Sequence, residues 1–164
     1  MILRYQFTAT IALTQIAGSL AAFDLFGLRK SIYNPRCAHA CREPISTSAL
    51  TCTEDNDNFS SSKCHATDDS FLQTLAHCIS RHCKLPIEEL ETYWRRHATG
   101  WEIVDPAPKY SYEIAVRLAG TPVQTVSWGN PLTNVSVINE KDYEKSYDSL
   151  LDWTDNENLH ARYA

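Results

Sequence analysis

Six cysteines are the residues of this sequence with the most evident chemistry, and all of them lie between Cys37 and Cys83. Their spacing is C-x3-C-x10-C-x11-C-x13-C-x4-C. It contains no C-x-x-C pair, the spacing that is typical of zinc sites. In a secreted chain an even number of cysteines predicts disulfides, here three, and six cysteines allow fifteen pairings.

The histidines are the other candidate metal ligands: His39, His65, His77, His82, His97 and His160. A metal or haem site needs several imidazoles on one face of the protein. Helices could bring His39 near the pair formed by His77 and His82, but a separation of five residues places that pair well apart around a helix. We therefore expect ordinary surface and core histidines, and no metal-binding residue.

Other catalytic patterns do not occur in the sequence. There is no G-x-S-x-G, no G-x-G-x-x-G and no P-loop. The acidic segment 53–58 lacks the glycine and the distal glutamate of an EF-hand, which favours a solvated loop over a calcium site. Cysteines that are oxidised to disulfides cannot serve as nucleophiles. We expect no catalytic and no cofactor-binding residue in this chain.

The first 22 residues resemble a secretory signal peptide. Arg4 gives a positive start, residues 7–20 carry no charge, and Ser19-Leu20-Ala21 offers small residues for cleavage after Ala21 or Ala22. An N-terminal core helix is the alternative. The predicted location is the secretory pathway, ending at the extracellular or cell-surface face of a membrane.

Two N-x-S sequons agree with secretion, and they predict glycosylation at Asn58 and Asn134. The chain has 164 residues, which is room for one domain. Its content of 43% hydrophobic and 21% charged residues is that of a globular protein. A formal charge of -5 excludes a non-specific nucleic-acid binder, which needs a basic surface.

The elements that position the cysteines are predicted to be helices. Asn34 can cap a first helix with Pro35 in its first turn, and Thr67 or Asp68 can cap a second helix that runs through Cys83. If these two helices pack antiparallel, the nested pairing is Cys37 with Cys83, Cys41 with Cys78, and Cys52 with Cys64. The helical stripe of the second helix comprises Phe71, Leu72, Leu75, Cys78, Ile79 and His82.

Segment 53–64 is polar and acidic and is expected to be an exposed loop. A third helix is predicted from Pro86 to a stop at Gly100. Its expected buried face consists of Ile87, Leu90, Trp94 and Ala98. The aromatic residues of this helix are expected in the core and not on a ligand-binding surface.

The second half of the chain is predicted to be irregular. A short helix over 111–119 stops at Gly120, and extended segments surround a turn at Gly129-Asn130-Pro131. Asn139 can cap a last helix with few apolar positions. The predicted fold class is therefore mainly α: a small disulfide-stapled helical domain with an irregular, partly extended second half and a C-terminal helix.

The predicted organisation has four parts. Residues 1–22 are the signal peptide and residues 23–100 the cysteine-rich helical domain. Residues 101–138 are a Pro-rich irregular or extended segment. Residues 139–164 are a C-terminal helix that leads towards a membrane span lying beyond this sequence.

The sequence resembles the N-terminal extracytoplasmic region of fungal ferric reductases, the ferric-chelate reductase transmembrane components. The resemblance covers Cys37 to Tyr163, and the cysteine spacing together with the flanking segments makes it specific. The segments in its first half are 37–41, 50–52, 64–68, 71–79, Cys83 and 91–94. Those in its second half are 106–108, 111–112, 130–136, 140–143 and 156–163. In that family the last of these segments lies just before the first transmembrane helix.

The family transfers electrons from cytosolic NADPH through FAD and two haems to extracellular ferric or cupric ions. Its haem ligands lie in transmembrane helices and its flavin and NADPH sites in a cytosolic domain, so the resemblance transfers no catalytic residue to this chain. It implies a non-catalytic extracytoplasmic accessory domain of a ferric-reductase-like membrane protein in reductive iron or copper uptake. The implied partner is a transmembrane reductase core, and the chain is a truncated product, a partial gene model or a stand-alone relative.

Two other functions are compatible with the sequence. The first is a small secreted cysteine-rich binding protein or effector, which should keep residues 140–164 packed on its own core. The second is reduction of iron by the isolated chain, for which the sequence offers no flavin or haem site. The net negative charge is also compatible with a weak attraction of Fe³⁺ or Cu²⁺ ions.

Overall fold

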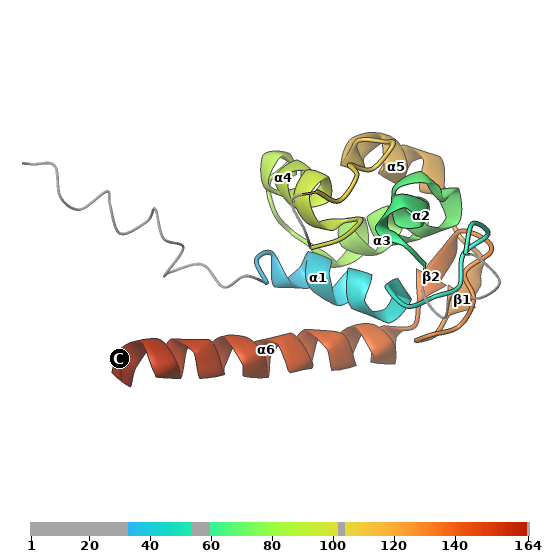
Figure 1. The fold of residues 1–164 in the computed structure, drawn as a ribbon. Helices are drawn as coiled ribbons and strands as arrows, with labels where there is room; N and C mark the ends of the chain where they lie inside the picture. Colours follow the sequence, from blue (N-terminus) through green and yellow to red (C-terminus); the bar gives the residue numbers. More distant parts are fainter. Residues whose placement is uncertain (1–32, 54–59, 102–103, 164) are drawn as a thin grey trace, which may run out of the picture. The chain divides into compact units, whose positions relative to one another are not determined.

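A computed structural model describes residues 33–53, 60–101 and 104–163, with side chains in the last helix described as far as Leu151. All of these residues belong to one compact unit, Ser31–Ala164 (Figure 1). The predicted signal peptide and Asn58 lie outside the described residues.

The described residues are mainly helical, which confirms the predicted fold class. The helices are α1 (Arg36–Arg42), the 3-10 helix η2 (Glu43–Ile45), α2 (Ser62–Thr67), α3 (Asp69–His82), α4 (Ile87–His97), α5 (Tyr112–Ala119) and α6 (Glu140–Tyr163). Two short strands, β1 (Gln124–Val126) and β2 (Ser136–Ile138), lie between α5 and α6.

Helix α3 lies at the centre of the unit and contacts α1, α2, α5 and β2. Its predicted apolar stripe is buried: Phe71, Leu72, Leu75 and Ile79 have no exposed surface. Thr74 is also fully buried, because its hydroxyl accepts a hydrogen bond of 2.9 Å from the backbone N–H of Ser136 in β2. A polar side chain thus connects the central helix to the sheet within the core.

Helix α3 begins at the residue that the sequence indicates. The Asp68 carboxylate accepts a hydrogen bond of 2.9 Å from the backbone N–H of Phe71, and a second of 2.7 Å from the Thr51 hydroxyl. Asp68 is only 6% exposed. The Asp68 carboxylate therefore provides a hydrogen-bond acceptor for a free backbone N–H in the first turn of α3, and it also connects α3 to the segment before Cys52.

Replacing Asp68 by alanine is expected to lower the free energy of unfolding by about 2 kcal/mol, because an N-cap typically contributes ~1 kcal/mol and the hydrogen bond that the Thr51 hydroxyl donates to the carboxylate contributes ~1 kcal/mol more. Asp69→Ala is the matched control. The Asp69 carboxylate forms an ion pair of 3.0 Å with Lys109 but is 55% exposed, so its loss should cost less than about 1 kcal/mol. Urea denaturation measures both values, and equal losses would contradict the capping role.

Three disulfides hold the described helices together. They join Cys37 to Cys83, Cys41 to Cys78 and Cys52 to Cys64, the same pairs that antiparallel packing implies. The first two pairs run in opposite directions along α1 and α3, so these helices are antiparallel. No free cysteine remains among the described residues.

The first and third helices differ at their ends from the sequence-based expectation. Helix α1 starts at Arg36 with Pro35 as its N-cap and no side-chain capping bond, so the predicted cap by Asn34 is wrong. Helix α4 ends with Ala98 as its C-cap, not at Gly100. Gly100 has another role, because a Cβ atom there would lie 1.8 Å from a carboxylate oxygen of Asp105.

The buried face of α4 is centred on Tyr93 and Trp94. The Tyr93 hydroxyl donates to the Ala38 carbonyl in α1 at 3.1 Å, and the Trp94 indole N–H donates to the Tyr110 carbonyl at 2.7 Å. Leu90 and Ala98 are buried as predicted. Ile87 is 44% exposed, so its predicted burial is wrong: it is the first residue of the helix.

Residues 60–63, the described part of the segment just before Cys64, differ from the exposed loop that the sequence predicts. Ser60 is only 8% exposed, and its hydroxyl donates to the Ser48 carbonyl at 2.9 Å. The Ser61 hydroxyl caps α2 by accepting from the backbone N–H of Cys64 at 3.2 Å. The prediction of an exposed loop is therefore wrong for Ser60, which is buried, and for the residues from Ser62 onward, which form the start of α2.

The extended segments form a two-stranded parallel sheet with Gln124 opposite Ser136. Parallel pairs normally need a crossover of a dozen or more residues, but here residues 127–135 suffice. The crossover is held against the helical part of the unit, since the Leu132 N–H donates to the Ala49 carbonyl at 2.9 Å. Gly129, with φ 72°, provides its left-handed backbone turn.

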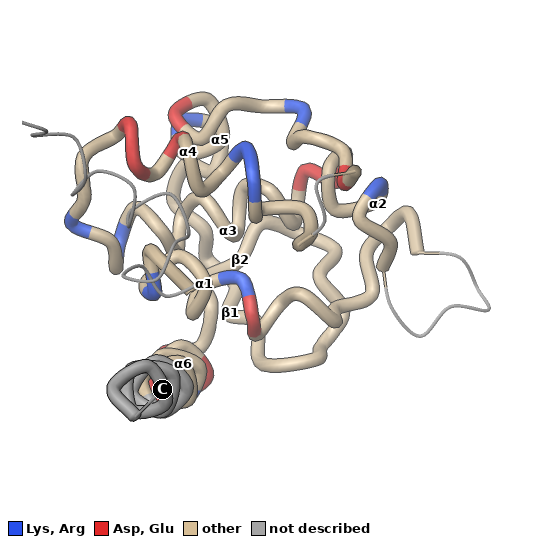
Figure 2. The backbone as a smooth tube through the Cα atoms, turned by 60° about the vertical axis from the view of Figure 1, so that its left-hand side comes forward, with Lys and Arg blue, Asp and Glu red and all other residues tan. Residues whose placement is uncertain are grey.

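Helix α6 packs along α1, as Figures 1 and 2 both show. Tyr143, Ser146 and Leu150 are its buried residues, and the Asn139 side chain accepts from the Lys141 N–H at its start, as predicted. No helix within the described residues is both long and apolar enough to cross a membrane. The side chains beyond Leu151 lie outside the described part.

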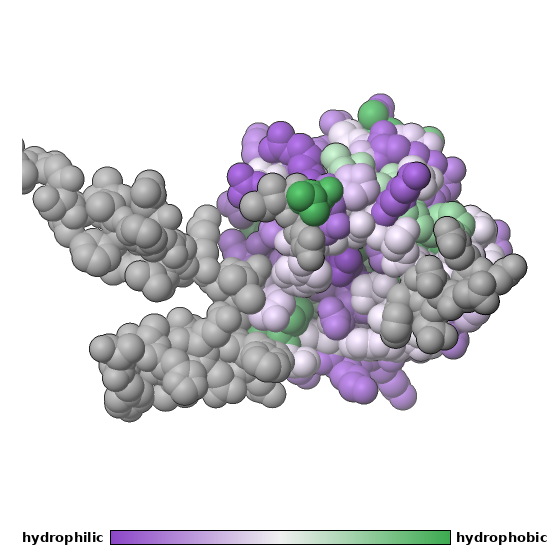
Figure 3. Space-filling view, viewed as in Figure 1, coloured by the Kyte–Doolittle hydropathy of each residue, from purple (hydrophilic) through white to green (hydrophobic). Residues whose placement is uncertain are grey.

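The described surface is largely hydrophilic. Figure 3 shows hydrophobic residues in small, separate patches on one face. In Figure 2 the Lys and Arg positions are interspersed with the Asp and Glu positions. The larger exposed apolar side chains include Val123 at 94% and Leu118 at 49%.

Candidate functional site

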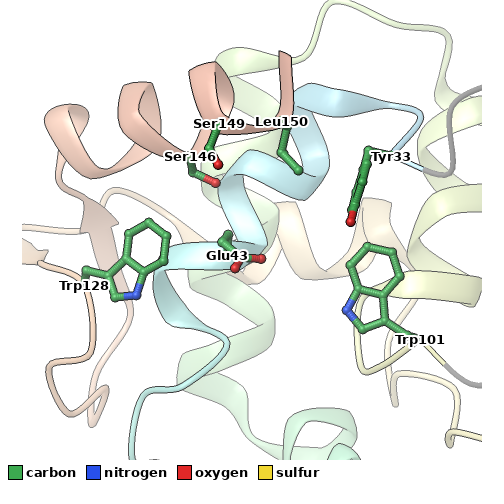
Figure 4. Close-up of a pocket in the computed structure, with 7 residues that line it drawn as sticks. All are labelled: Tyr33, Glu43, Trp101, Trp128, Ser146, Ser149 and Leu150. Carbon is green, nitrogen blue, oxygen red and sulfur yellow. The ribbon is translucent and has the colours of Figure 1, made fainter. Parts of the chain in front are cut away.

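A pocket beside α6 is the candidate site, and we call it the α6 pocket. It has a volume of about 340 Å³ and is lined by Tyr33, Glu43, Trp101, Trp128, Ser146, Ser149 and Leu150 (Figure 4). These residues come from the segment before α1, the start of η2, the end of the α4 region, the crossover between the strands, and α6. The packing of α6 on α1 and η2 therefore builds the pocket.

Two partly exposed indoles flank the pocket. Trp101 is 47% and Trp128 39% exposed, and Figure 4 shows them on opposite sides of Glu43. The Trp128 backbone N–H donates to the Asp142 carboxylate at 2.9 Å, which connects the crossover to the first turn of α6. Trp101 contacts the edge of Tyr33, with ring centres 5.7 Å apart. Both indoles are thus held by neighbours on other segments.

A buried hydroxyl without a partner lies in the wall of the pocket. Ser146 is 1% exposed, and its Oγ makes no hydrogen bond with any described residue. Figure 4 shows its side chain beside that of Ser149, on the α6 side of the cavity. Buried polar groups are nearly always hydrogen-bonded, so this hydroxyl is a candidate contact for a bound molecule.

Charges of both signs surround the pocket. The Glu43 carboxylate lies within it, and no described residue forms an ion pair or hydrogen bond with that carboxylate. The Lys145 ammonium lies 5.7 Å from the centre of the Trp128 ring, and the Arg42 guanidinium 5.9 Å from the Trp101 ring. Each indole therefore already has an internal cation near it.

His39 forms the support behind Trp101. The two rings are stacked, with centres 4.9 Å apart and planes 14° apart, and Tyr93 packs edge-on against His39 at 4.8 Å. His39 is 2% exposed, and neither ring nitrogen has a hydrogen-bond partner among the described residues. Burial, His97 and Arg42 lower the pKa of His39 to about 3, so the ring stays neutral near pH 7.

His65 is a second buried imidazole. It is 4% exposed, stacks on Phe71 at 4.3 Å between ring centres, and its Nδ1 lies 3.3 Å from the Thr99 carbonyl. Burial and Arg42 lower its pKa to about 4, against the opposing hydrogen bond with Thr99. Both buried histidines are therefore aromatic core residues in their neutral form at pH 7.

Two histidines have aromatic neighbours that the sequence analysis did not consider. His39 lies beside His97, with ring centres 5.5 Å apart, a pair that the sequence analysis did not anticipate. His82 stacks instead on Tyr143 of α6, with ring centres 3.8 Å apart. Within the described ranges no three His, Cys, Asp or Glu side chains are grouped so that they could hold a metal ion. The side chain of His160 lies outside these ranges.

Of the predicted glycosylation sites, Asn134 is described and exposed. It stands just before β2, and its carbonyl accepts a hydrogen bond of 2.9 Å from the Ser136 hydroxyl of the same sequon. Its modification stays a prediction. The cysteines predicted to form disulfides are all paired and offer no thiol chemistry.

The α6 pocket was missed by the sequence analysis. Its lining comes from five segments between Tyr33 and Leu150, and no spacing rule connects them. The one available indication was the position of Trp101 and Trp128 beside Gly100 and Gly129, outside any expected helix. The expectation of core aromatics holds for Trp94, and the two flanking tryptophans lie in irregular backbone at the surface.

The pocket offers aromatic faces, three hydroxyls (Tyr33, Ser146 and Ser149) and a carboxylate, which is a binding arrangement. The Ser146 hydroxyl has no hydrogen-bond partner among the described residues, so no described base activates it as a nucleophile. Comparison of the chain with protein-family models, with curated proteins and with solved structures finds no match.

Proposed function

We propose that this chain is a non-catalytic extracytoplasmic accessory domain of a ferric-reductase-like membrane protein that serves reductive uptake of iron or copper. The observation that carries the proposal is the set of three disulfides, which is typical of an oxidising compartment. The cysteines that they join are also those whose spacing carries the resemblance to the ferric reductases.

Helix α6 supports the membrane-bound part of the proposal. It starts on the domain, where Tyr143 and Leu150 are buried, and continues to Tyr163. Its last residues, 156–163, resemble the segment that precedes the first transmembrane helix in the family. A continuous helix would carry the domain at a fixed distance from a reductase core, its proposed partner. A glycan on the exposed Asn134 is compatible with this location.

Sequencing of complete transcripts from the native cells tests the proposal. We expect the reading frame to continue beyond Ala164 into several apolar spans. We also expect disruption of the gene to lower reduction of a ferric chelate at the cell surface. A stop codon after Ala164 in independent transcripts, together with unchanged surface reduction, would contradict the proposal.

The second candidate, a small secreted binding protein, is favoured by the α6 pocket and by the packing of Tyr143, Ser146 and Leu150. Limited proteolysis distinguishes the two candidates. A membrane-linked domain should be cleaved only within residues 152–163, the part of α6 that precedes the proposed membrane span. Uniform resistance through residues 152–163 would favour the secreted protein.

A further inference from the structure

We propose that the α6 pocket binds a short neutral oligosaccharide, whose sugar residues stack against Trp128 and Trp101 and are hydrogen-bonded by Ser146 and Glu43. This inference goes beyond the proposed function and does not depend on a membrane partner. The size of the pocket is suitable, since about 340 Å³ falls at the lower end of the range for small-molecule pockets.

The aromatic faces are the first argument. Large indoles are normally well buried, and both pocket tryptophans remain more than a third exposed. A pyranose ring has C–H groups on its faces and hydroxyls around its rim. Such a ring can cover an indole face and still present its hydroxyls to polar groups. In Figure 4 the indoles lie on either side of the polar residues. This arrangement places aromatic faces where the C–H faces of a sugar would lie and polar groups where its hydroxyls would lie.

The unpartnered hydroxyl of Ser146 is the second and independent argument. Ser146 is 1% exposed, and its Oγ has neither donor nor acceptor among the described residues. A buried hydroxyl in this state is unfavourable until a partner enters the cavity. A sugar hydroxyl can donate to Ser146 and accept from it. The Glu43 carboxylate accepts from a second hydroxyl.

The charges around the pocket favour a neutral occupant. A cationic ligand would be repelled by Lys145 near Trp128 and by Arg42 near Trp101, each within 6 Å of the ring centre. An anionic ligand would lie against the Glu43 carboxylate. A purely apolar ligand would leave both Ser146 and Glu43 without partners. A polyhydroxylated, uncharged molecule avoids all three costs.

The pocket walls are preorganised for such a ligand. His39 supports the Trp101 ring from behind, and its neutral form adds no charge. The Trp128 backbone is connected to Asp142, and Gly129 beside it donates to the Pro44 carbonyl at 3.4 Å. Preformed walls lower the ordering cost of binding.

The test measures retention of the purified, disulfide-intact chain on three insoluble polymers: chitin, a β-1,3-glucan and mannan. We expect retention on at least one of them. The soluble tetrasaccharide of that polymer should then quench or shift tryptophan fluorescence on titration. Retention should be unchanged in 0.5 M NaCl, because contacts with a neutral sugar are not screened by salt.

Two variants locate the binding. Ser146→Ala removes only the unpartnered hydroxyl, so it should weaken sugar binding at least tenfold while thermal stability is unchanged or raised. Trp128→Ala should also weaken binding at least tenfold. Leu118→Ala is the control, since Leu118 is a 49% exposed residue on α5 that does not line the pocket, and its binding should equal that of the wild type.

Glu43→Gln separates the sugar from a charged ligand. The amide oxygen still accepts a hydrogen bond from a hydroxyl, so sugar binding should fall by less than tenfold. The proposal is overturned if the wild type is retained on none of the three polymers. It is also overturned if either pocket variant leaves retention unchanged, or if 0.5 M NaCl or Glu43→Gln abolishes it. Since the purified chain is tested alone, these results are separate from those of the transcript experiment.

Discussion

Joint replacement of Cys41 and Cys78 by alanine is expected to lower the free energy of unfolding by about 4 kcal/mol. Because the enclosing Cys37–Cys83 disulfide stays closed in this variant, the lost bridge closed a ring of only about ten residues, for which chain-entropy arithmetic gives about 3 kcal/mol, and lost packing adds to this value. Cys41 has no exposed surface and Cys78 is 3% exposed, so the loss also weakens packing between α1 and α3.

The matched variant replaces Cys52 and Cys64, whose sequence separation is 12 residues. Its expected loss is about 3 kcal/mol. Cys52 is exposed, so this change leaves a smaller defect in the core. Denaturant unfolding at pH 7 measures both variants. A Cys41/Cys78 variant within 1 kcal/mol of the wild type would show that this bridge does not hold the core together.

Acidification from pH 7.5 to pH 4.5 is expected to lower the free energy of unfolding by about 5 kcal/mol. The cause is the pair of buried imidazoles, His39 with a pKa of about 3 and His65 with a pKa of about 4. Unfolded histidines titrate near pH 6.5. Between these values the unfolded chain binds about two more protons than the folded chain, so stability falls as the pH falls.

Each imidazole contributes about 2.5 kcal/mol over this range, because the loss is about 1.36 kcal/mol for each pH unit between the unfolded pKa near 6.5 and the final pH of 4.5. His97 changes stability in the same direction, because burial lowers its pKa. Lys109 lowers the pKa of Asp69, so protonation of this carboxylate also lowers stability as the pH falls, mainly below pH 4.5.

The variant His39→Phe provides the control for the acid effect. It keeps an aromatic ring against Trp101 and removes one titrating group, so the loss between pH 7.5 and pH 4.5 should be halved. At pH 7.5 the variant should be at least as stable as the wild type, because the His39 nitrogens have no described partners. A pH dependence identical to that of the wild type would refute the assignment to His39.

Local rules predicted the helices that carry the disulfides. The cap at Asp68 and the stripe through Phe71, Leu75 and Ile79 depend only on neighbouring residues, and both are present in the structure. The helix over residues 112–119 with its end at Gly120 follows from equally local signals. Cysteine positions on two such helices then imply nested pairs, because antiparallel helices bring the ends of one opposite the starts of the other.

Features that depend on tertiary contacts could not be predicted in this way. The parallel pairing of β1 with β2 depends on Thr74, whose hydroxyl accepts from the Ser136 N–H inside the core. The burial of Ser60 depends on the Ser48 carbonyl. His39 is a polar residue type that the sequence does not mark as buried. Its burial results from contacts with the aromatic rings of Tyr93 and Trp101. Each of these depends on a partner more than ten residues away.

The candidate site was the least predictable part of the structure. Its polar groups, Glu43 and Ser146, lie on helices whose contact joins residues separated by about a hundred positions. Nothing in the pattern around Ser146 distinguishes it from the exposed Ser149 nearby. Only the packing of α6 on α1 makes one hydroxyl buried and leaves it in a cavity.

Disulfide mapping of protein isolated from its native cells, alkylated before any reduction, tests most directly whether the chain matures in an oxidising compartment. We expect no alkylated cysteine and three linked peptide pairs: Cys37 with Cys83, Cys41 with Cys78, and Cys52 with Cys64. Six alkylated cysteines in the native material would contradict the account.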